Sequence, residues 1–469
     1  MTKFLSKKKL LTAPVKRQTQ WVNNIDPFIP EWWANETLAI LEEEMVAAQL
    51  VNRDFEKYFN VHGDIVNTRR PSEFIGVRKT KNQNVTTQDA TATNVAITLD
   101  QWNHVSFTID DLESVMSMKV LQDQYARPAA VALARMVDQS LLMQYPRFLP
   151  NMAGRLNGLT DSTVKGYLID LRQIMDDNKA YNAGRNLILS SKTEADYLRP
   201  EWFTAADRIG DNGTALRQAR LGHLLGFETY KDLNVGVVAA GNTKRSFQIN
   251  NAAGYAVGDT AITVDTGTGE ITVGTWVEIE GMPYQVSART GTAPTTAITL
   301  TYGLKRAVLD NAVVSVYTPG AVNNASGYAA GWTQAITVDG FSVAPRVGQL
   351  VSFGTDTTNI YGIIQVSGTT SIVLDRALAA TIADDATVNI GPPGAYNLAI
   401  HKDAITLAVR PLKAVIGGTG ALSATRNLNG LSIRVTISYD AVAQKHRWTF
   451  DFLTGLQVLD TDLGAVLLG

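Results

Sequence analysis

The sequence predicts an α+β protein that carries two small all-β modules as an insertion. Amphipathic helical segments alternate with strand-like runs in the amino-terminal half, and from about position 236 to 394 the composition shifts to Thr, Gly, Val and Ala. Within that stretch the pentapeptide AITVD at 261–265 recurs at 335–339, a constant offset of 335 − 261 = 74. Other apolar, glycine and aspartate positions keep this offset, so each copy is expected to form roughly five or six short strands of a β-barrel or sandwich.

Composition limits the possible classes of protein. The chain has 469 residues, 45% of them hydrophobic, and a formal net charge of −2. This length suffices for about three domains, and the small charge gives no overall attraction to nucleic acid or to a membrane. Cysteine is absent, which excludes disulfides and cysteine metal sites and is compatible with a reducing cytoplasm. No apolar run approaches the roughly 18 residues that a membrane helix needs.

The amino-terminal segment 1–30 is basic. No acidic residue occurs before Asp26, and no apolar segment typical of a signal peptide follows the first lysines. We expect an unstructured basic arm, with a solvated tail as the alternative. Its cations are Lys3, Lys7, Lys8, Lys9, Lys16 and Arg17.

Residues 31–58 are expected to form a helix, with Glu42, Glu43 and Glu44 turned outward and an apolar face made by Trp33, Leu38, Leu41, Met45, Ala48 and Leu50 or Val51.

Residues 63–110 follow as a long two-stranded hairpin: strands 65–68 and 74–78, a polar tip near 82–94, and returning strands at 97–98 and 105–109. An isolated hairpin is marginally stable, so this one is expected to rest on something outside its own domain. Its first strand is basic, with solvated charge as one interpretation and contact with an acidic patch on a neighbour as the sharper hypothesis: Arg69, Arg70, Arg78, Lys79 and Lys81.

Residues 123–148 are expected to form the longest helix of the chain. Pro128 suits its first turn, and no further proline occurs before Pro146. The apolar positions at three- and four-residue steps include Val137 and Leu141, which we assign to the core. Arg127, Arg135, Asp138 and Gln139 take the other, wetter positions.

The remaining segments predict one mixed body that the β-modules interrupt. Before the modules we expect helices at 163–177, 193–198 and 215–221, a buried strand at 186–190, and a turn and strand at 226–235. After them, 395–412 is apolar and compatible with strand or helix, 431–439 alternates as a strand, and 447–468 gives two more strands.

No motif for catalysis or cofactor binding is present. The chain contains no HExxH, GxxxxGK[ST] or GxSxG, and its five histidines (His62, His104, His223, His401 and His446) are scattered. Gly417, Gly418 and Gly420 lack the strand-to-helix context of a dinucleotide loop and are interpreted as a turn. Carboxylates from distant segments remain free to meet in space. We therefore expect no enzyme and no cofactor.

The order of these parts resembles the major capsid protein of tailed bacteriophages, the Hong Kong 97 shell fold. Local phrases agree with it: DDLES at 110–114, GFETYKDLNV at 226–235, NLAIHKDAITLAVRPL at 397–412 and RWTFDFLTGLQVLDTDLGAV at 447–466. The resemblance implies an arm (1–30), an amino-terminal helix region (31–62), an extended loop (63–111), a spine helix with peripheral domain (112–160), an axial domain (161–236 and 395–425) holding β-modules at 237–320 and 321–394, and closing peripheral strands (426–469).

By that resemblance the chain is a structural subunit that forms the hexamers and pentamers of an icosahedral head around double-stranded DNA. It implies a virion protein assembled in the host cytoplasm, with a portal, a separate scaffolding protein and an optional decoration protein as partners and no membrane. The short segment before the first helix leaves no room for a fused scaffolding domain. Some family members cross-link a loop lysine to a neighbour; Lys79 and Lys81 are possible donors by position, no acceptor matches, and no cross-link is expected.

Three alternatives remain: a tail or other virion β-structural protein, an encapsulin-type shell, and an enzyme with an inserted carbohydrate-binding pair. The helical amino-terminal half, the large insertion and the missing site motifs argue against them in turn. Deleting 241–393 is expected to leave the remaining fold intact but to impair assembly or particle stability.

Overall fold

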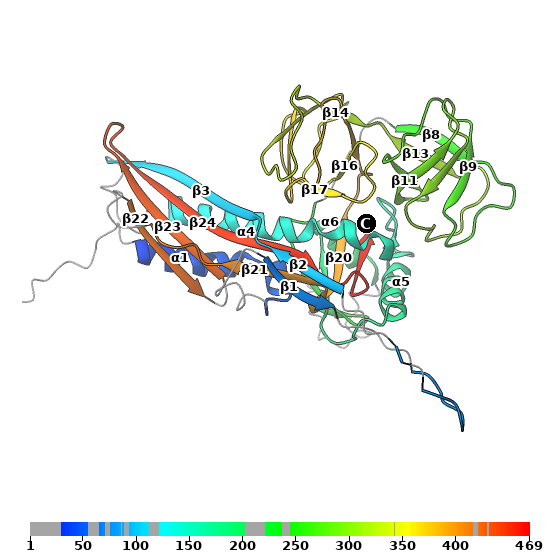
Figure 1. The fold of residues 1–469 in the computed structure, drawn as a ribbon, viewed down its shortest axis with the longest axis horizontal. Coiled ribbons are helices and arrows are strands. Elements are labelled where there is room, and N and C mark those ends of the chain that lie inside the picture. The colour runs from blue at the N-terminus through cyan, green and yellow to red at the C-terminus, as the bar shows by residue number, and fades with distance from the viewer. Residues whose placement is uncertain are drawn as a thin grey trace, which may run out of the picture.

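A long helix-on-sheet layer forms one half of the protein, and a mixed sheet with two β-barrels forms the other (Figure 1). The computed structural model describes residues 30–54, 65–70, 76–85, 87–88, 93–111, 122–201, 221–236, 244–341, 343–415, 421–428 and 431–469. The amino-terminal arm and positions 215–220 of one expected helix therefore lie outside the described residues.

The long layer is built on a five-stranded antiparallel sheet. Its central strand β24 (Lys445–Val458) pairs on one side with β23 (Leu431–Asp440) and β21 (Ile405–Arg410), and on the other with β3 (Gln101–Asp110); β22 (Ala421–Leu428) completes it beyond β23. Residues 433–438 of β23 and 447–450 of β24 alternate between buried apolar and more exposed polar side chains, which is the period that a sheet with one covered face requires.

Two helices cover the apolar face of this sheet. Helix α1 (Pro30–Glu44) packs on β22 and β23, and α4 (Arg127–Leu142) packs beside α1 and against β3 and β24. The ring centroids of Trp33 and Trp448 are 4.6 Å apart, which places a pair of buried aromatic rings at the centre of the contact.

The helix expected over 31–58 is wrong in length. It ends at Glu44, and a 3₁₀ turn (Ala47–Gln49) follows it. The carboxylate of Asp138 on α4 accepts the backbone N–H groups of Val46 and Ala48, at 2.9 and 3.2 Å, so these groups bond to another helix instead of continuing α1. The expected apolar positions are nonetheless buried, because the chain stays against the same core.

The helix expected over 123–148 is confirmed in place, but only part of it is α-helical. A π-turn (Gln122–Ala126) precedes α4 and a 3₁₀ segment (Tyr145–Asn151) follows it, with Pro128 in the first turn as expected. Asp138 does not take a wetter position: its exposed fraction is 0%. The expectation was wrong because Asp138 accepts hydrogen bonds from the backbone N–H groups of residues 46 and 48. These hydrogen bonds compensate the burial of its carboxylate.

The second body is a six-stranded mixed sheet in the order β4-β25-β20-β5-β7-β6. Helices α5 (Val164–Asp177) and α6 (Ser191–Leu198) accompany it, as expected from sequence, and the hydroxyl of Ser190 caps α6 by accepting the N–H of Thr193. The strands are β4 (Met152–Gly154), β5 (Arg185–Leu189), β6 (His223–Leu224), β7 (Phe227–Lys231), β20 (Tyr396–His401) and β25 (Gly464–Leu468). Strands from before and after the barrels are thus neighbours, since β20 pairs with β5.

Each copy of the sequence repeat forms a closed six-stranded barrel between β7 and β20. Barrel 1 contains β8 (Lys244–Ile249), β9 (Ala261–Asp265), β10 (Trp276–Ile279), β11 (Met282–Thr290), β12 (Ala297–Leu300) and β13 (Val313–Tyr317). Barrel 2 contains β14 (Gly320–Val322), β15 (Ile336–Asp339), β16 (Leu350–Phe353), β17 (Tyr361–Ser367), β18 (Ser371–Leu374) and β19 (Thr387–Ile390).

The repeat extends to single hydrogen bonds. In barrel 1 the carboxylate of Asp310 accepts the backbone N–H of Asn251 at 2.9 Å, and in barrel 2 Asp384 accepts that of Asn324 at the same distance. The two aspartates are separated by the same constant offset that relates the two copies of AITVD in the sequence.

The expected hairpin is present but shorter. Strands β1 (Ile65–Arg70) and β2 (Thr93–Thr98) pair antiparallel, and residues 76–85 between them extend away from both sheets (Figure 1). The strand expected at 74–78 is not formed in its described part, 76–78. The residues expected to close the hairpin, 105–109, belong instead to β3, because their apolar side chains pack beside Phe450 and Tyr125.

Candidate functional site: the junction of helix α4 with the barrels

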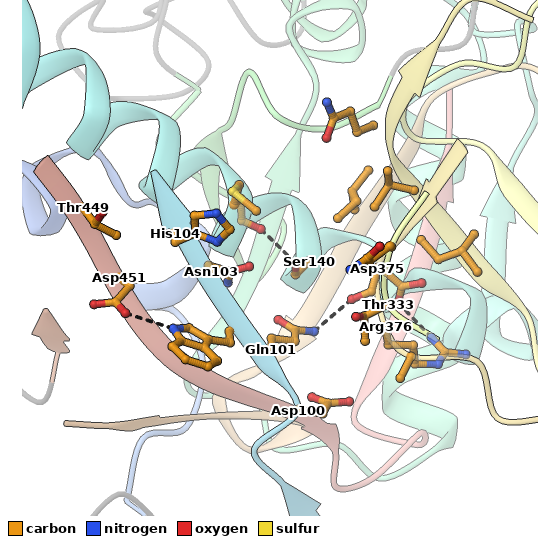
Figure 2. A pocket seen from close by; sticks show the side chains of 18 of the residues that line it. Asp100, Gln101, Asn103, His104, Ser140, Thr333, Asp375, Arg376, Thr449 and Asp451 are labelled. Atoms are coloured by element: carbon orange, nitrogen blue, oxygen red, sulfur yellow. Dashed lines mark hydrogen bonds and ion pairs between the residues drawn. The ribbon is translucent and has the colours of Figure 1, made fainter. Parts of the chain in front are cut away.

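A cavity of about 890 Å³ lies where β3, α4 and barrel 2 meet above the long sheet (Figure 2). Its volume falls in the range of ligand-binding pockets. Strand β3 forms one wall, barrel 2 the opposite wall, and α4 contributes Met136 and Ser140. The polar side chains that converge on it include Gln101, His104, Thr333, Asp375, Arg376 and Asp451.

Asp375 is the centre of the polar network on the barrel side. Its carboxylate is buried and accepts the N–H of Gly362 at 2.8 Å, the guanidinium of Arg376 at 2.9 Å and the amide of Gln144 at 3.3 Å. Burial raises the pKa of the Asp375 carboxyl, while Arg376 and the Gly362 N–H act to lower it. The backbone carbonyl of Asp375 also accepts from Gln101 at 2.9 Å, so this residue connects β3, α4 and barrel 2.

A second ion pair lies on the sheet side of the cavity. Arg434 on β23 and Asp451 on β24 form a bidentate salt bridge, and Asp451 also accepts the indole N–H of Trp102 at 3.1 Å. The Trp102 side chain is 62% exposed, although its ring is held by a carboxylate that is itself buried. The sheet therefore presents a large aromatic group to solvent in a fixed orientation.

The carboxyl-terminal end of α4 is buried by barrel 2. The hydroxyl of Tyr145 donates to the backbone carbonyl of Gly348 at 2.9 Å, and its ring stacks on Tyr396 with centroids 4.6 Å apart. A Cβ added at Gly362 would lie 2.6 Å from Met143, so this glycine permits the close approach of barrel and helix.

The two barrels use equivalent faces for docking. Barrel 1 docks on barrel 2 through Gln285, whose amide donates to Gly274 within its own barrel and to Ser352 across the contact, at 3.1 and 3.0 Å. The carbonyl of Gly274 corresponds, through the repeat offset, to that of Gly348, the group that meets Tyr145. One repeated surface thus contacts barrel 2 in the first copy and α4 in the second.

Three acidic side chains line or adjoin the cavity, and two of them form ion pairs. Asp375 and Asp451 each face an arginine, so their charges are compensated locally. A third carboxyl at the cavity, Asp100, has its pKa raised chiefly by burial, with the charge of Asp375 as a smaller cause and Arg376 acting against it. Two separate ion pairs, Asp375 with Arg376 and Asp451 with Arg434, therefore hold the two sides of the cavity in place.

A buried carboxylate pair lies elsewhere in the protein. The pKa of Asp138 is raised to about 7, chiefly by burial of its carboxyl and secondly by the charge of Asp232. Neither residue lines the cavity, and both are at most 3% exposed, so a substrate has no access to them. This pair is accordingly assigned to the packing of α4.

Within the described residues, no group of three His, Asp or Glu side chains lies close enough to hold a metal ion. Over the same residues, no helix is both long and apolar enough to cross a membrane.

Comparisons with known proteins were made at the level of sequence and of structure. No protein-family model and no curated protein matches the sequence. Solved structures do match. A chain from Mycobacterium phage Che8 is 12% identical, with 90% of each chain covered and a TM-score of 0.43.

Two further matches are described as phage capsids. The capsid structure of cyanophage P-SCSP1u matches at 11% identity over 87% of this chain and 84% of that one, with a TM-score of 0.41. The mature capsid of bacteriophage PhiM1 matches at 9% identity over 87% and 82%, with a TM-score of 0.39. The chain is thus similar along most of its length to phage capsid chains.

The residues singled out from sequence occupy three different places. Arg69 and Arg70 end strand β1, while Arg78, Lys79 and Lys81 are exposed in the projecting segment 76–85. Val137 and Leu141 lie in the core, with exposed fractions of 2% and 1%. The arm cations Lys7, Lys8, Lys9, Lys16 and Arg17 lie outside the described residues, as do Gly417, Gly418 and Gly420.

None of these predicted residues lines the cavity, and sequence reasoning missed the residues that do. One usable signal was present for the barrel side. Asp375 and Arg376 follow the matched stretch of the second copy, whereas the first copy has Thr301 and Tyr302 at the same offset. A charged pair that replaces neutral residues in only one copy marks where that copy meets a different partner.

Proposed function

We propose that this chain is the shell-forming subunit of a phage head, which assembles with copies of itself into hexamers and pentamers of an icosahedral particle around double-stranded DNA. One observation carries the proposal. A long helix lies on a narrow five-stranded sheet, a separate mixed sheet adjoins its end, and residues 76–85, between β1 and β2, extend beyond both (Figure 1). Such a subunit leaves elements that only neighbouring copies can support.

Within this proposal the helix-on-sheet layer is the peripheral domain and the mixed sheet is the axial domain. The pairing of β5 with β20 supports treating 161–236 and 395–425 as parts of one domain, with the modules 237–320 and 321–394 inserted between them. The hairpin of 63–111 is the extended loop. A shell multiplies modest contacts, so each of them can be weak while the particle is stable.

The partners follow from the same proposal. A portal and a separate scaffolding protein take part in assembly in the host cytoplasm, packaged DNA contacts the shell without sequence preference, and a decoration protein is optional. The basic arm, with Lys7, Lys8, Lys9, Lys16 and Arg17, is assigned to inner contacts where it meets phosphate or an acidic neighbour. Lys79 and Lys81 remain free of a covalent role in this proposal.

Electron microscopy of purified native particles, with mass spectrometry of their shell protein, tests the proposal. We expect closed icosahedral shells made mainly of this chain and enclosing nuclease-protected double-stranded DNA. Tubes or fibres would favour a tail protein, and closed shells that hold protein cargo without DNA would favour an encapsulin-type shell. Absence of the chain from any particle would refute all shell assignments.

A further inference from the structure

The cavity at the end of α4 holds its charges in pairs. Arg434 bonds to Asp451 on the sheet side, and Arg376 bonds to Asp375 on the barrel side, across the cavity (Figure 2). Among the described lining residues, each arginine thus has an aspartate as its partner, and positive charge is not in excess. A phosphate or sulfate group that enters a cavity exchanges its bonds to water for bonds to free cationic donors. The charge balance therefore suits a ligand without negative charge.

Trp102 gives the cavity one large aromatic surface. Its indole N–H donates to the carboxylate of Asp451 at 3.1 Å, which fixes the orientation of the ring, while 62% of the side chain is exposed. The face of an aromatic ring is partly negative and attracts the partly positive hydrogens of C–H groups. A sugar ring presents C–H groups on its faces and hydroxyl groups around its rim. Because the indole is already oriented, it loses little freedom when such a ring stacks on it.

Side-chain amides in the walls of the cavity can bond to hydroxyl groups. The amide nitrogen of Asn103 is buried and has no hydrogen-bond partner among the described residues. A ligand oxygen that reaches it would relieve the cost of an unpaired donor. Gln365 on β17 is exposed in the opposite wall, and its amide bonds to no described residue. An amide both donates and accepts, as a hydroxyl does, so the two groups can bond in either sense.

The sequence repeat shows that the barrel does not need the amide of Gln365. This residue is the first paired position after a register shift on β17, and Ala288 is the first after the matching shift on β11 of barrel 1. Barrel 1 closes with alanine at this position. The amide of barrel 2 therefore has its use outside the barrel, where it faces the cavity.

From these observations we infer that the cavity between β3, α4 and barrel 2 binds a neutral saccharide, with one sugar ring stacked on Trp102 and its hydroxyl groups bonded by Asn103 and Gln365. This binding activity goes beyond the proposed shell function and does not depend on it, because the site lies within one chain. In a closed shell the site recurs in every copy. Many weak sites on one particle hold a saccharide-coated surface far more tightly than a single site does.

Saturation-transfer NMR with the unassembled full-length chain tests the site. The probes are three neutral trisaccharides, maltotriose, mannotriose and triacetylchitotriose, together with heparin disaccharide as an anion and tetra-alanine as a peptide. The peptide tests for strand addition to β3, which has one pairing partner among the described strands. We expect at least one neutral trisaccharide to bind and the other two probes to bind more weakly or not at all.

Substitutions locate the binding within the cavity. Trp102→Ala should weaken it by about tenfold or more, and Trp102→Phe, which retains a ring, by less. Gln365→Ala copies barrel 1 and should weaken it by about two- to tenfold, the value of one hydrogen bond. Trp332→Ala is the matched control, since this side chain is 37% exposed but does not line the cavity, and it should leave binding unchanged. Melting temperatures show that each variant is folded.

The outcomes separate the saccharide site from the shell function. If no neutral trisaccharide binds, or if folded Trp102→Ala binds as well as the natural chain, the saccharide site is wrong and the shell proposal stands. Stronger binding of heparin disaccharide or of tetra-alanine would overturn the choice of a neutral saccharide. Failure of the chain to form particles would refute the proposed function and leave a site that the single chain binds through intact.

Discussion

Replacing Asp138 by asparagine probes the contact that joins α4 to the turn after α1. The carboxylate accepts two backbone N–H groups, those of Val46 at 2.9 Å and of Ala48 at 3.2 Å. An asparagine side chain offers one oxygen, so its NH₂ group must face the other N–H. Leaving a buried donor without a partner costs about 1–3 kcal/mol. At acidic pH the variant is therefore expected to be less stable than the natural chain.

The pH dependence follows from the direction of the pKa change. Burial, with the charge of Asp232 next, raises the pKa of Asp138 from 3.8 to about 7. Below pH 3.8 the carboxyl is protonated in both the folded and the unfolded chain, and its contribution to stability is fully present. As the pH rises toward 7 the unfolded chain ionises first, so that contribution is lost. A pKa raised by this much corresponds to a loss of about 4 kcal/mol.

Thermal unfolding followed by circular dichroism at pH 5, 6, 7 and 8 measures this effect. The asparagine variant has no titrating group at 138, so its deficit relative to the natural chain should be largest at pH 5 and should shrink, or reverse, by pH 8. Asp161→Asn, at an exposed position, is the matched control and should give a curve parallel to that of the natural chain. Parallel curves for Asp138→Asn would refute the burial argument. Equal melting temperatures in a further scan at pH 3, where the carboxyl is protonated in both states of the natural chain, would refute the hydrogen-bond argument.

Three further predictions concern the helix and the barrels. Val137→Asp should prevent folding, because it places an unpaired charge in the core; recovery of soluble, assembly-competent protein would contradict this. Gly362→Ala should lower the free energy of unfolding by about 1–3 kcal/mol, since its Cβ would lie 2.6 Å from Met143. Gly166→Ala in α5, where a Cβ meets nothing within 4 Å, should be neutral or stabilising; equal denaturant midpoints for the two alanine variants would contradict the steric argument. Deleting barrel 1 alone (244–317) should lower the melting temperature less than deleting both barrels, because barrel 2 covers the end of α4; equal melting temperatures would show that this cover contributes nothing.

Features that depend on local periodicity could be predicted from the sequence. The long helix between Pro128 and Pro146 and the two barrels were predictable, because helical spacing and a fixed repeat offset are visible without knowledge of partners. The length of α1 was not, since it depends on Asp138 reaching the N–H of Val46 from a distant part of the chain. Asp138 was expected to be solvated, because a sequence does not show which distant N–H groups will compensate a buried charge.

The strand β3 shows the same limit at the level of pairing. Its alternation correctly indicates a strand, but a hairpin partner and a sheet partner satisfy that pattern equally well. Strand β3 pairs with β24 because Phe107 stacks on Phe450 and because the two strands pair along the whole of β3. Both contacts depend on a segment near the opposite end of the chain. Local pattern determines the type of an element, and long-range packing decides its neighbour.

The two barrels separate these contributions within one molecule. They share a sequence pattern, a strand order and the turn that Asp310 and Asp384 hold, so the pattern alone determines their internal structure. Their equivalent faces nevertheless contact different surfaces, and the residues that differ there decide which. Gln285 reaches Ser352 from the first copy, whereas Asp375 bonds to Gln144 at the end of α4 from the second. Because the helix end is buried by this second contact, barrel 2 is part of the support of α4, and the insertion is more than an appendage on an independent body.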